Sequence, residues 1–339
     1  MTTVVALGGN ALVRQGQRGT AAEQLANLRE ALPALAPVLQ EPRVVVTHGN
    51  GPQVGNELRR HERAADEVPP LPLWLAVAQT QAEIGALIES ELRTIADRPV
   101  VCVLTHVRVD EDDPAFAEPT KPIGPFHSEE EAETLRRERG WTMVADAGRG
   151  YRRTVASPAP LEVVELEPIR TLVAARTIAI ACGGGGIPVA RREGSLRGVD
   201  AVIDKDRASA LLATELGAER LLILTDVDAL YRDFGSADQR EVRELSADDA
   251  EALLPELAQG SMRPKVEASF AFVRATGGEV IVTSPAAATG EPLRRRRRSR
   301  SSSWSQSGRW SRRGRSPSRA EAAVSPSRGA RGACAASTP

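Results

Sequence analysis

The sequence predicts an α/β fold built on a parallel sheet that helices cover on both faces. Short apolar runs recur along the chain, and each run is continuous rather than alternating in polarity. Continuous apolar runs are typical of strands that are buried on both faces. Segments with helical periodicity separate most of the runs, and strands that alternate with helices form parallel sheets. The predicted strands are residues 3–7, 44–47, 99–107, 177–182, 201–203, 221–225 and 279–283.

The helices between these strands are predicted from their end signals and their periodicity. Residues 20–23, Thr-Ala-Ala-Glu, form a capping box at the start of one helix. Residues 246–249, Ser-Ala-Asp-Asp, begin another that runs to about 258. Pro264 in the first turn and Gly277 just past the end bracket the last helix. Apolar periodicity predicts three more helices, from 52 to about 66, from about 71 to 96 and from about 206 to 216.

Two stretches depart from this alternation. Between about 108 and 165, proline, glycine and charged residues dominate, which indicates a small protruding lid subdomain. We expect this lid to be inserted in one large domain that covers residues 1–290. Residues 291–339, called the tail below, contain 13 arginines, 12 serines and almost no large aliphatic side chains, so we expect a disordered tail.

The net charge of −1 hides two parts of opposite sign. The tail carries about +11, which leaves about −12 on residues 1–290 and argues against a nucleic-acid-binding surface there. Three interpretations of the tail remain open: an arm that contacts nucleic acid, an arm docked on the acidic body, or an out-of-frame continuation of the gene.

Cysteine usage and hydropathy indicate where the protein functions. The three cysteines provide no disulfide framework and fit a reducing compartment. No apolar run approaches 18 residues, and the first residues lack the basic segment of a signal peptide. We therefore expect a cytoplasmic protein without a membrane span.

Glycine-rich or polar turns follow four of the predicted strands. They come after Leu7, Thr47 and Cys182, and at Thr225-Asp226. The carboxyl ends of parallel strands meet at one edge of the sheet, where open α/β sheets bind their ligands. Glycine lets backbone N–H groups approach an anion closely. The sequence therefore predicts an anionic ligand at this edge.

Lysine is rare in this chain, which has three lysines against 41 arginines. Because lysine is a compact point charge and arginine a planar fork, a lysine that survives such a bias indicates a site that a guanidinium cannot fill. Lys205 lies between two aspartates at a predicted strand-to-helix turn, and Lys265 lies in the first turn of a helix, where a cation is unfavourable unless an anion binds. Lys121 lies in the lid. Phosphoryl transfer needs such positive charge on the oxygens of the moving group.

The usual nucleotide and metal motifs are missing. No lysine is followed by serine or threonine, which excludes a P-loop, and no G-x-G-x-x-G is present. The four histidines stand apart from one another and from the cysteines, so we assign no residue as a metal ligand. What remains is a phosphate site made of glycine backbone and lysine point charges.

Eight segments of the chain match one known family, in that family's order. Two of them are specific: Thr-Lys-Pro-Ile-Gly-Pro-Phe at 120–126 and Cys-Gly-Gly-Gly-Gly-Ile-Pro-Val at 182–189. The other segments are residues 5–11, 47–55, 146–153, 201–206, 224–228 and 260–268. On these residues, from 1 to about 284, the chain resembles the carbamate kinases of the amino acid kinase fold family.

The resemblance implies a three-layer αβα sandwich around a mainly parallel sheet of about eight strands. It implies an enzyme that transfers a phosphoryl group reversibly between ATP and carbamate, with Mg²⁺, to give ADP and carbamoyl phosphate. In arginine catabolism this reaction runs toward ATP. The resemblance also implies a homodimer that acts on these small molecules and not at a membrane.

The resemblance further implies a role for each matching site residue. The expected catalytic residues are Lys121, Lys205, Asp206 and Lys265, with Asp206 orienting the ammonium groups of Lys205 and Lys265. Carbamate and the transferring phosphoryl group are expected at Gly8, Gly9, Asn10, Gly49, Asn50 and Gly51. The nucleotide is expected at Asp226, Tyr231 and Met262.

Two other functions remain open. Another kinase of the same fold would act on a larger carboxylate, such as an acylated glutamate, although residues 120–126 argue against the room that it needs. A nucleic-acid-binding protein would act through the basic tail.

Overall fold

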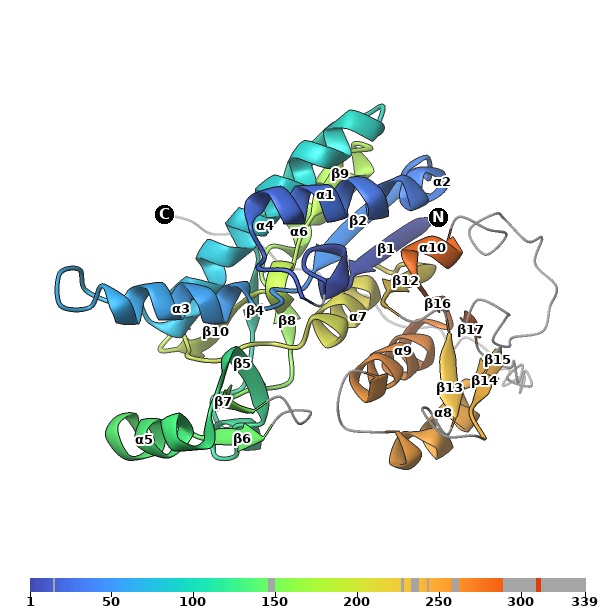
Figure 1. Ribbon diagram of the computed structural model, residues 1–339. Coiled ribbons are helices and arrows are strands. Elements are labelled where there is room, and N and C mark those ends of the chain that lie inside the picture. Colours follow the sequence, from blue (N-terminus) through green and yellow to red (C-terminus); the bar gives the residue numbers. More distant parts are fainter. Residues whose placement is uncertain are drawn as a thin grey trace, which may run out of the picture.

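An eight-stranded, mainly parallel sheet forms the core of the protein (Figure 1). The structure is a computed structural model that describes residues 1–14, 16–145, 150–226, 229–232, 238–242, 244–257, 262–288 and 309–311. In order across the sheet the strands are β15 (Glu244–Ser246), β17 (Arg309–Ser311), β16 (Glu279–Thr283), β12 (Arg220–Leu224), β1 (Thr2–Leu7), β2 (Arg43–His48), β9 (Ile178–Ile180) and β3 (Val100–Cys102). Neighbouring strands run parallel except for β16 and β17. The predicted fold class is confirmed.

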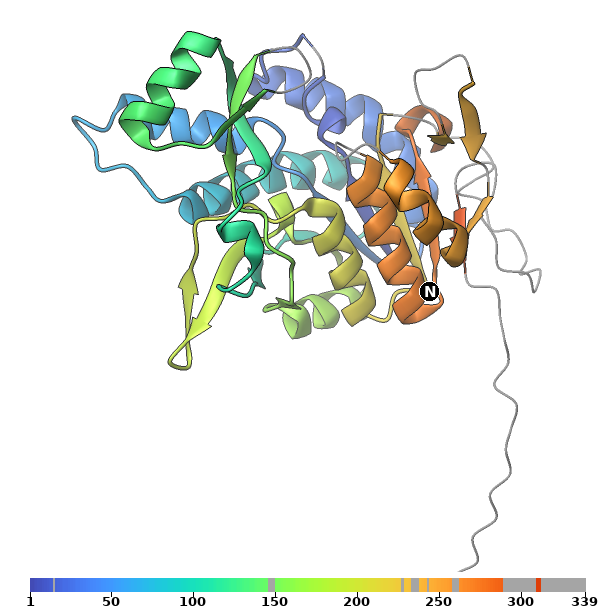
Figure 2. The same cartoon turned by 90° about the horizontal axis from the view of Figure 1, so that it is seen from below.

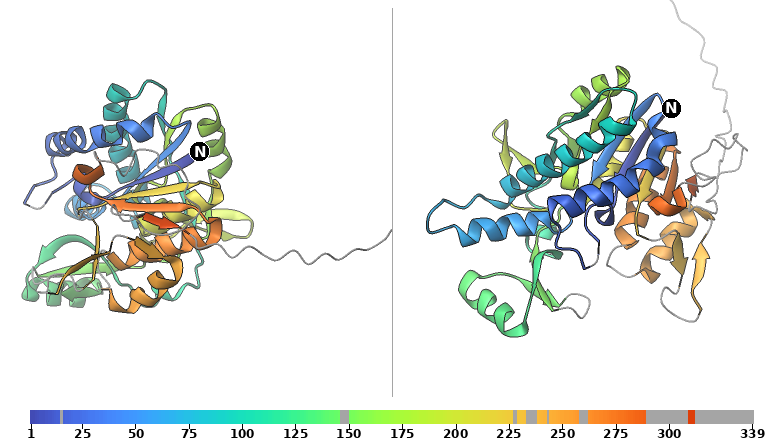
Figure 3. Two further views of the ribbon diagram at one scale, coloured as in Figure 1. Left: turned by 90° about the vertical axis from the view of Figure 1, so that its right-hand side faces the viewer. Right: turned by 45° about the horizontal axis from the view of Figure 1, so that its top comes forward.

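The central strands bury both faces, which explains their continuous apolar runs. In β1, Val5 and Leu7 belong to one buried cluster, and Val4 and Ala6 belong to a second cluster on the opposite face. Helices cover the two faces from opposite sides (Figure 3). One layer contains α1 (Ala21–Ala31), α2 (Ala36–Leu39) and α4 (Leu73–Ile95), and the other contains α6 (Leu166–Ala174), α7 (Lys205–Glu215), α8 (Ala247–Leu253) and α9 (Met262–Thr276). These layers form the predicted αβα sandwich.

Two strand predictions were wrong. The run at 99–107 forms two strands in different sheets, β3 and β4 (His106–Arg108). The chain turns between them at Thr105, whose N–H donates to Gln81 Oε1 at 2.6 Å and whose carbonyl accepts from Ile187 N at 2.8 Å. Residues 201–203 are buried but form no strand, and they lead directly into α7.

A second sheet lies beside the first. Its strands, in order, are β11 (Ser195–Gly198), β10 (Ile187–Arg192), β4 and β8 (Glu162–Val163). Both ends of the expected lid insertion, near residues 108 and 162, belong to this sheet. The chain therefore enters and leaves the lid from neighbouring strands, since β4 pairs with β8.

The lid itself is a three-stranded antiparallel sheet with one helix (Figure 2). It contains β5 (Lys121–His127), β7 (Tyr151–Val155), β6 (Met143–Ala145) and α5 (Glu129–Arg139). It packs on α3 (Gln53–Arg63) of the body. Its regular structure is difficult to predict because β5 contains Pro122, Gly124 and Pro125, all of which are unfavourable in strands.

Short elements connect these parts. They are η1 (Gly9–Ala11), η2 (Leu32–Leu35), η3 (Pro114–Phe116), η4 (Gly183–Gly185), η5 (Leu254–Glu256), the hairpin β13 (Leu230–Arg232) and β14 (Arg240–Val242), and α10 (Pro285–Ala288). In the part of the chain that the structure describes, no helix is long and apolar enough to cross a membrane.

The tail contributes one strand to the main sheet. The boundary at 290 and most of the tail lie outside the described residues. Arg309–Ser311, however, form β17, which lies antiparallel to β16 and parallel to β15. Three residues of a segment expected to be disordered therefore have regular structure. The physical reason is that backbone groups at an open sheet edge pair with an extended segment whatever its side chains.

Removal of residues 291–339 should loosen this edge of the sheet. Among the described strands β15 pairs with β17 alone, so truncation leaves Glu244–Ser246 without a neighbour. A lost backbone hydrogen bond costs about 1 kcal/mol, so hydrogen exchange in β15 and at Val280 should accelerate roughly fivefold. Exchange in β2 serves as the internal control. Unchanged exchange at Val280 would show that β17 does not complete the edge.

Candidate active site

The turns that follow β1, β2, β9 and β12 converge at the carboxyl-end edge of the sheet, as predicted. A Cβ atom on Gly8 would lie 2.5 Å from the carbonyl oxygen of Leu224 at the end of β12. A Cβ atom on Gly184 would lie 2.1 Å from Asn50 Oδ1. The backbone of Leu224 at the first point and the buried side chain of Asn50 at the second leave room for glycine only.

The predicted carbamate and phosphate residues lie on two of these turns. Gly8, Gly9 and Asn10 follow β1, and the other three predicted residues, Gly49, Asn50 and Gly51, follow β2. Gly9 approaches Gly51 to 4.0 Å, measured from an added Cβ to Cα. The structure therefore brings the two turns together.

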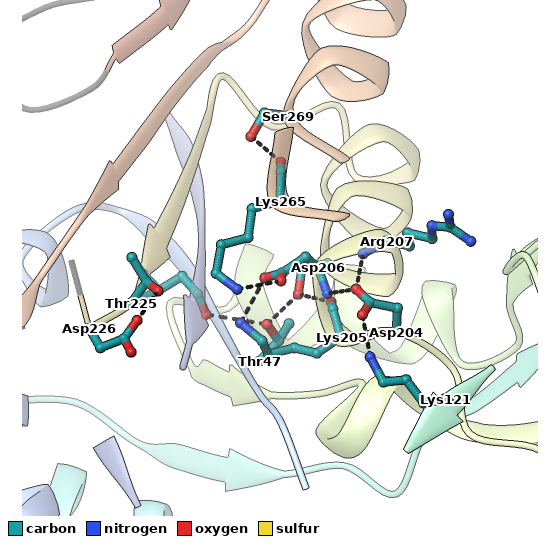
Figure 4. A network of polar contacts seen from close by, with 12 residues as sticks. Thr47, Lys121, Asp204, Lys205, Asp206, Arg207, Thr225, Asp226, Lys265 and Ser269 are labelled. Carbon is teal, nitrogen blue, oxygen red and sulfur yellow. Dashed lines mark hydrogen bonds and ion pairs between the residues drawn. The ribbon is translucent and has the colours of Figure 1, made fainter. Parts of the chain in front are cut away.

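Three lysines gather beside the turns (Figure 4). Lys121 is the first residue of β5 in the lid, Lys205 is the first residue of α7, and Lys265 lies in the first turn of α9. Lys205 Nζ and Lys265 Nζ lie 2.7 and 3.1 Å from the two carboxylate oxygens of Asp206. Lys121 Nζ lies 2.7 Å from Asp204 Oδ2. These five residues are called the lysine cluster below.

Asp206 is the centre of the lysine cluster. Its side chain is 4% exposed, and each of its oxygens holds one ammonium group. With three cations and two carboxylates, the cluster carries one net positive charge. Asp204, which flanks Lys205 in the sequence, was not among the predicted catalytic residues, and its carboxylate pairs with Lys121 and not with Lys205.

Burial and charge act on the two buried lysines in opposite directions. Burial lowers the pKa of Lys205, and the carboxylate of Asp206 offsets this only in part. Burial also acts on Lys265, but Asp206 and the more distant Asp204 and Asp226 outweigh it and raise its pKa. An anion bound beside them would favour the charged form of both lysines.

Buried polar groups form the floor of the site. Thr47 Oγ1 and Ser209 Oγ lie 2.6 Å apart, and the Ser209 hydroxyl is also 2.7 Å from the carbonyl oxygen of Lys205. Asn50 is 6% exposed, and neither Oδ1 nor Nδ2 of its side chain has a hydrogen-bond partner among the described residues. An unpaired buried polar group costs about 1–3 kcal/mol, so the Asn50 amide indicates a ligand. Sequence reasoning missed Ser209, although it lies one helical turn after Lys205.

His48 is a second buried side chain with an unpartnered atom. It is fully buried, with Nδ1 3.0 Å from the carbonyl oxygen of Gly49, and its Nε2 has no hydrogen-bond partner in the described part of the chain. Nε2 faces Gly183, where an added Cβ would come within 2.3 Å. Burial lowers the pKa of His48 to about 4, so the imidazole is neutral at neutral pH.

The three predicted nucleotide residues lie on separate elements. Asp226 follows β12 and is exposed, with Oδ1 accepting from Thr225 Oγ1 at 3.0 Å. Its effect on the pKa of Lys265 links it to the lysine cluster. Tyr231 in β13 and Met262 at the start of α9 are half-buried, and their nucleotide role stays a prediction.

Two cavities lie where the lid meets the body. One, of about 410 Å³, is lined by α3, β5 and α5, and the other, of about 470 Å³, shares Trp141 and Arg153 with it. Beside the first cavity α3 and β5 touch, because a Cβ atom on Gly55 would lie 2.1 Å from Gly124 Cα. The lid therefore meets α3 in a close backbone contact, and its Ile123 and Val155 belong to one buried apolar cluster with Val54 and Leu58 of α3.

Comparison with known proteins identifies the family. A model of the amino acid kinase family matches residues 1–284. This chain belongs to the amino acid kinase family. Its similarity to the carbamate kinases of that family is extensive, as the resemblance in the sequence predicted.

Relatives and solved structures agree on this placement within the amino acid kinase family. The carbamate kinase of Halobacterium salinarum is 46% identical over 290 residues, which cover 85% of this chain and 94% of the relative. Carbamate kinase 2 of Staphylococcus aureus (strain MRSA252) is 43% identical over 292 residues, covering 83% and 93%. The structure of carbamate kinase from Giardia lamblia bound to AMP-PNP has a TM-score of 0.76 and 38% identity, covering 84% and 93%.

The free energy of unfolding should decrease as the pH falls below 6.5, because the buried His48 is neutral in the folded protein. As the pH decreases from 6.5 toward about 4, His48 binds a proton in the unfolded chain but stays neutral in the folded chain. The free energy of unfolding therefore has its full value, as far as His48 is concerned, above pH 6.5. Below pH 6.5 it decreases, by about 3 kcal/mol in total. Urea unfolding over this pH range should show a smaller acid loss for His48→Gln than for the wild type.

In that experiment, the free energy of unfolding of each protein at acid pH is compared with its own value near neutral pH. A loss of packing caused by glutamine affects both values and drops out of the difference. An acid loss of the same size in both proteins would contradict a neutral, buried His48.

Gly55→Ala should displace the lid without unfolding the kinase domain. Alanine favours a helix over glycine by about 1 kcal/mol, but the collision of the new Cβ with the Gly124 backbone outweighs this gain, so thermal stability should fall. The added methyl group collides with the backbone of Gly124, and hydrogen exchange in β5 should therefore accelerate. Asn56→Ala, the next position of α3, is the matched control. Equal exchange of β5 in the two variants would show that this contact does not fix the lid.

Proposed function

We propose that this protein transfers a phosphoryl group reversibly between ATP and carbamate, giving ADP and carbamoyl phosphate. The lysine cluster beside the glycine turns is the observation that carries the proposal. The curated relatives are carbamate kinases, which supports carbamate as the acceptor. The Giardia lamblia relative binds AMP-PNP, which supports ATP and ADP as the nucleotides.

The chemistry depends mainly on position and charge, because phosphoryl transfer needs little covalent help from the protein. A carbamate oxygen forms a bond to the γ-phosphorus of ATP while the bond to the ADP oxygen breaks, and ADP leaves with that electron pair. Lys205 and Lys265 supply positive charge to the oxygens of the phosphoryl group. Since Asp206 already holds both ammonium groups, they need no rearrangement when that charge develops.

Asn50 suits carbamate in particular. Its unpartnered amide offers one acceptor, Oδ1, and one donor group, Nδ2. Carbamate carries an amino group and a carboxylate on one carbon, so it can donate to Oδ1 and accept from Nδ2. An acylated glutamate has no free amino group at this place and would leave Oδ1 unpaired.

Mg²⁺ would arrive with the nucleotide. Among the residues that the structure describes, no group of three or more His, Cys, Asp or Glu side chains is arranged to hold a metal. Asp204 and Asp206 are engaged with lysines, whereas the exposed Asp226 is available beside them. This arrangement fits Mg²⁺, which commonly binds through one carboxylate, several waters and the substrate phosphates. The ion would neutralise charge on the nucleotide oxygens.

The lid would complete the site. Lys121 enters from β5, and 36% of its side chain is exposed, so its ammonium can also contact a phosphoryl oxygen. The open space beside the lid contact with α3 gives the lid room to close on substrate.

We further propose that the enzyme is a cytoplasmic homodimer that works toward ATP in arginine catabolism. The resemblance to the carbamate kinases supports each of these three statements. Light scattering of the purified protein tests the dimer directly.

An assay for ATP formed from ADP and carbamoyl phosphate tests the reaction. We expect ATP in this reaction, and the reverse assay should show ADP formed from ATP with carbamate and not with N-acetylglutamate. The opposite preference would identify a kinase of larger carboxylates. Salt-dependent binding of nucleic acid that is lost on truncation at 290 would assign a separate role to the tail.

Lys205→Arg should fail almost as completely as Lys205→Ala. Loss of one preorganised charge at a transition state lowers kcat by roughly 10²–10³-fold, and the planar guanidinium cannot take the place of the ammonium between Asp206 and substrate. Arg207→Lys, two positions later on α7, is the matched control and should keep kcat, because its side chain pairs with Glu267 outside the lysine cluster. Near-normal turnover by Lys205→Arg would overturn the role given to this lysine.

A further inference from the structure

An ion pair joins the lid to the body at the lysine cluster. Lys121 Nζ in the lid lies 2.7 Å from Oδ2 of Asp204, which is 83 residues away in sequence and immediately precedes α7 (Figure 4). A second ion pair between lid and body joins Arg153 Nη1 to Glu62 Oε1 at 3.8 Å on α3, away from the cluster. The two pairs differ in geometry and in place, so they allow a controlled comparison.

The two carboxylate oxygens of Asp204 have different hydrogen-bond partners. Oδ1 accepts from the backbone N–H groups of Asp206 at 2.9 Å and Arg207 at 3.3 Å, and so caps α7. Oδ2 is left for Lys121. Asparagine or serine supplies the capping hydrogen bonds as well as aspartate does, so those bonds do not require a charged residue. Among the lysines, Lys121 of the lid interacts most strongly with the negative charge of Asp204.

The environment of Asp204 makes the pair a strong one. Asp204 is buried, which by itself would raise its pKa, but Lys121 and then Lys205 and Lys265 outweigh burial and hold its pKa well below the usual range. Because capping fixes the carboxylate, Oδ2 marks a fixed point to which the more exposed Lys121 is drawn. Asp206 cannot serve Lys121 in the same way, since its oxygens already hold Lys205 and Lys265.

We propose that Asp204 is a positioning residue that holds the lid against the body through Lys121 and aims the ammonium of Lys121 at the transferring phosphoryl group. The proposal rests on the proposed function for its substrate, but the lid contact itself does not. An ammonium has three donors, so one can stay on Asp204 Oδ2 while another reaches a phosphoryl oxygen. Asp204 then acts before substrate arrives, by keeping the lid near its working position.

Asp204→Asn separates the two tasks of this side chain. The amide oxygen still caps α7, whereas the charge that holds Lys121 is gone. Charge-assisted hydrogen bonds are about twice as strong as neutral ones, so we expect roughly a tenfold rise in KM for carbamoyl phosphate. Hydrogen exchange across β5, β6 and β7 should accelerate by a similar factor in the substrate-free protein and return toward wild type at saturating ADP and carbamoyl phosphate.

Glu62→Gln is the matched control. It removes the other lid-to-body ion pair by the same carboxylate-to-amide change, and it should leave KM for carbamoyl phosphate unchanged. Lys121→Gln breaks the Asp204 pair from the lid side and leaves α7 intact, so it covers the case in which Asp204→Asn fails to fold. In the Lys121→Gln background, Asp204→Asn should add no further lid exchange.

Three results would overturn the proposal. One is wild-type lid exchange in Asp204→Asn or Lys121→Gln. Another is additive effects of the two substitutions on lid exchange. The third is a lower KM in Asp204→Asn, which would mean that Asp204 competes with substrate for Lys121 instead of positioning it. If the wild type forms no ATP, the proposed function fails, and the exchange measurements still decide whether Asp204 holds the lid.

Discussion

The carboxylate of Asp206 is the contact on which the site depends. Two ammonium groups brought together in a buried place repel each other and lose their solvation, and both effects favour the neutral amine. Asp206 gives each of them its own oxygen, so Lys205 and Lys265 can lie side by side with their charges. The same contact fixes how α7 and α9 pack, because each helix supplies one of the lysines near its first residue. One side chain thus serves both the proposed catalysis and the packing of the two helices.

The sheet determines where this contact can form. Parallel strands end at a common edge of the sheet. The pairing of the strands therefore brings together turns that are far apart in sequence. The close approaches at Gly8 and Gly184 occur at this edge, and the first turn of α7 faces it. Both faces of the sheet behind this edge are buried, while the lid lies outside the αβα layers (Figure 2).

The sequence allowed the prediction of whatever depends on local pattern or on composition. Continuous apolar runs predicted the central strands, and the scarcity of lysine pointed to three residues that the structure brings into one cluster. The break between β3 and β4 could not be predicted, because apolar residues continue across it and the hydrogen bond that marks it comes from Gln81 on α4, 24 residues away. The pairing of Asp204 with Lys121 and of Thr47 with Ser209 was also out of reach, since 83 and 162 residues separate the partners. The strand β17 depends on an unpaired sheet edge, which no sequence pattern in the tail reveals.

The substrate-free site is built at a cost to stability, and that cost is informative. Lys205 has a lowered pKa, and neither Oδ1 nor Nδ2 of the buried Asn50 amide has a partner among the described residues. Neither of these features stabilises the fold by itself, since each leaves charge or hydrogen-bonding capacity unsatisfied. One kind of ligand would provide the missing partners, namely a small anion that carries a hydrogen-bond donor beside its negative charge. A polar or charged group that lacks a partner before binding interacts strongly with negative charge that develops on the ligand. The interaction is strong because burial has already removed the water that would screen it. If the protein has the proposed function, the cost in the free protein and the binding of the reacting group have the same origin.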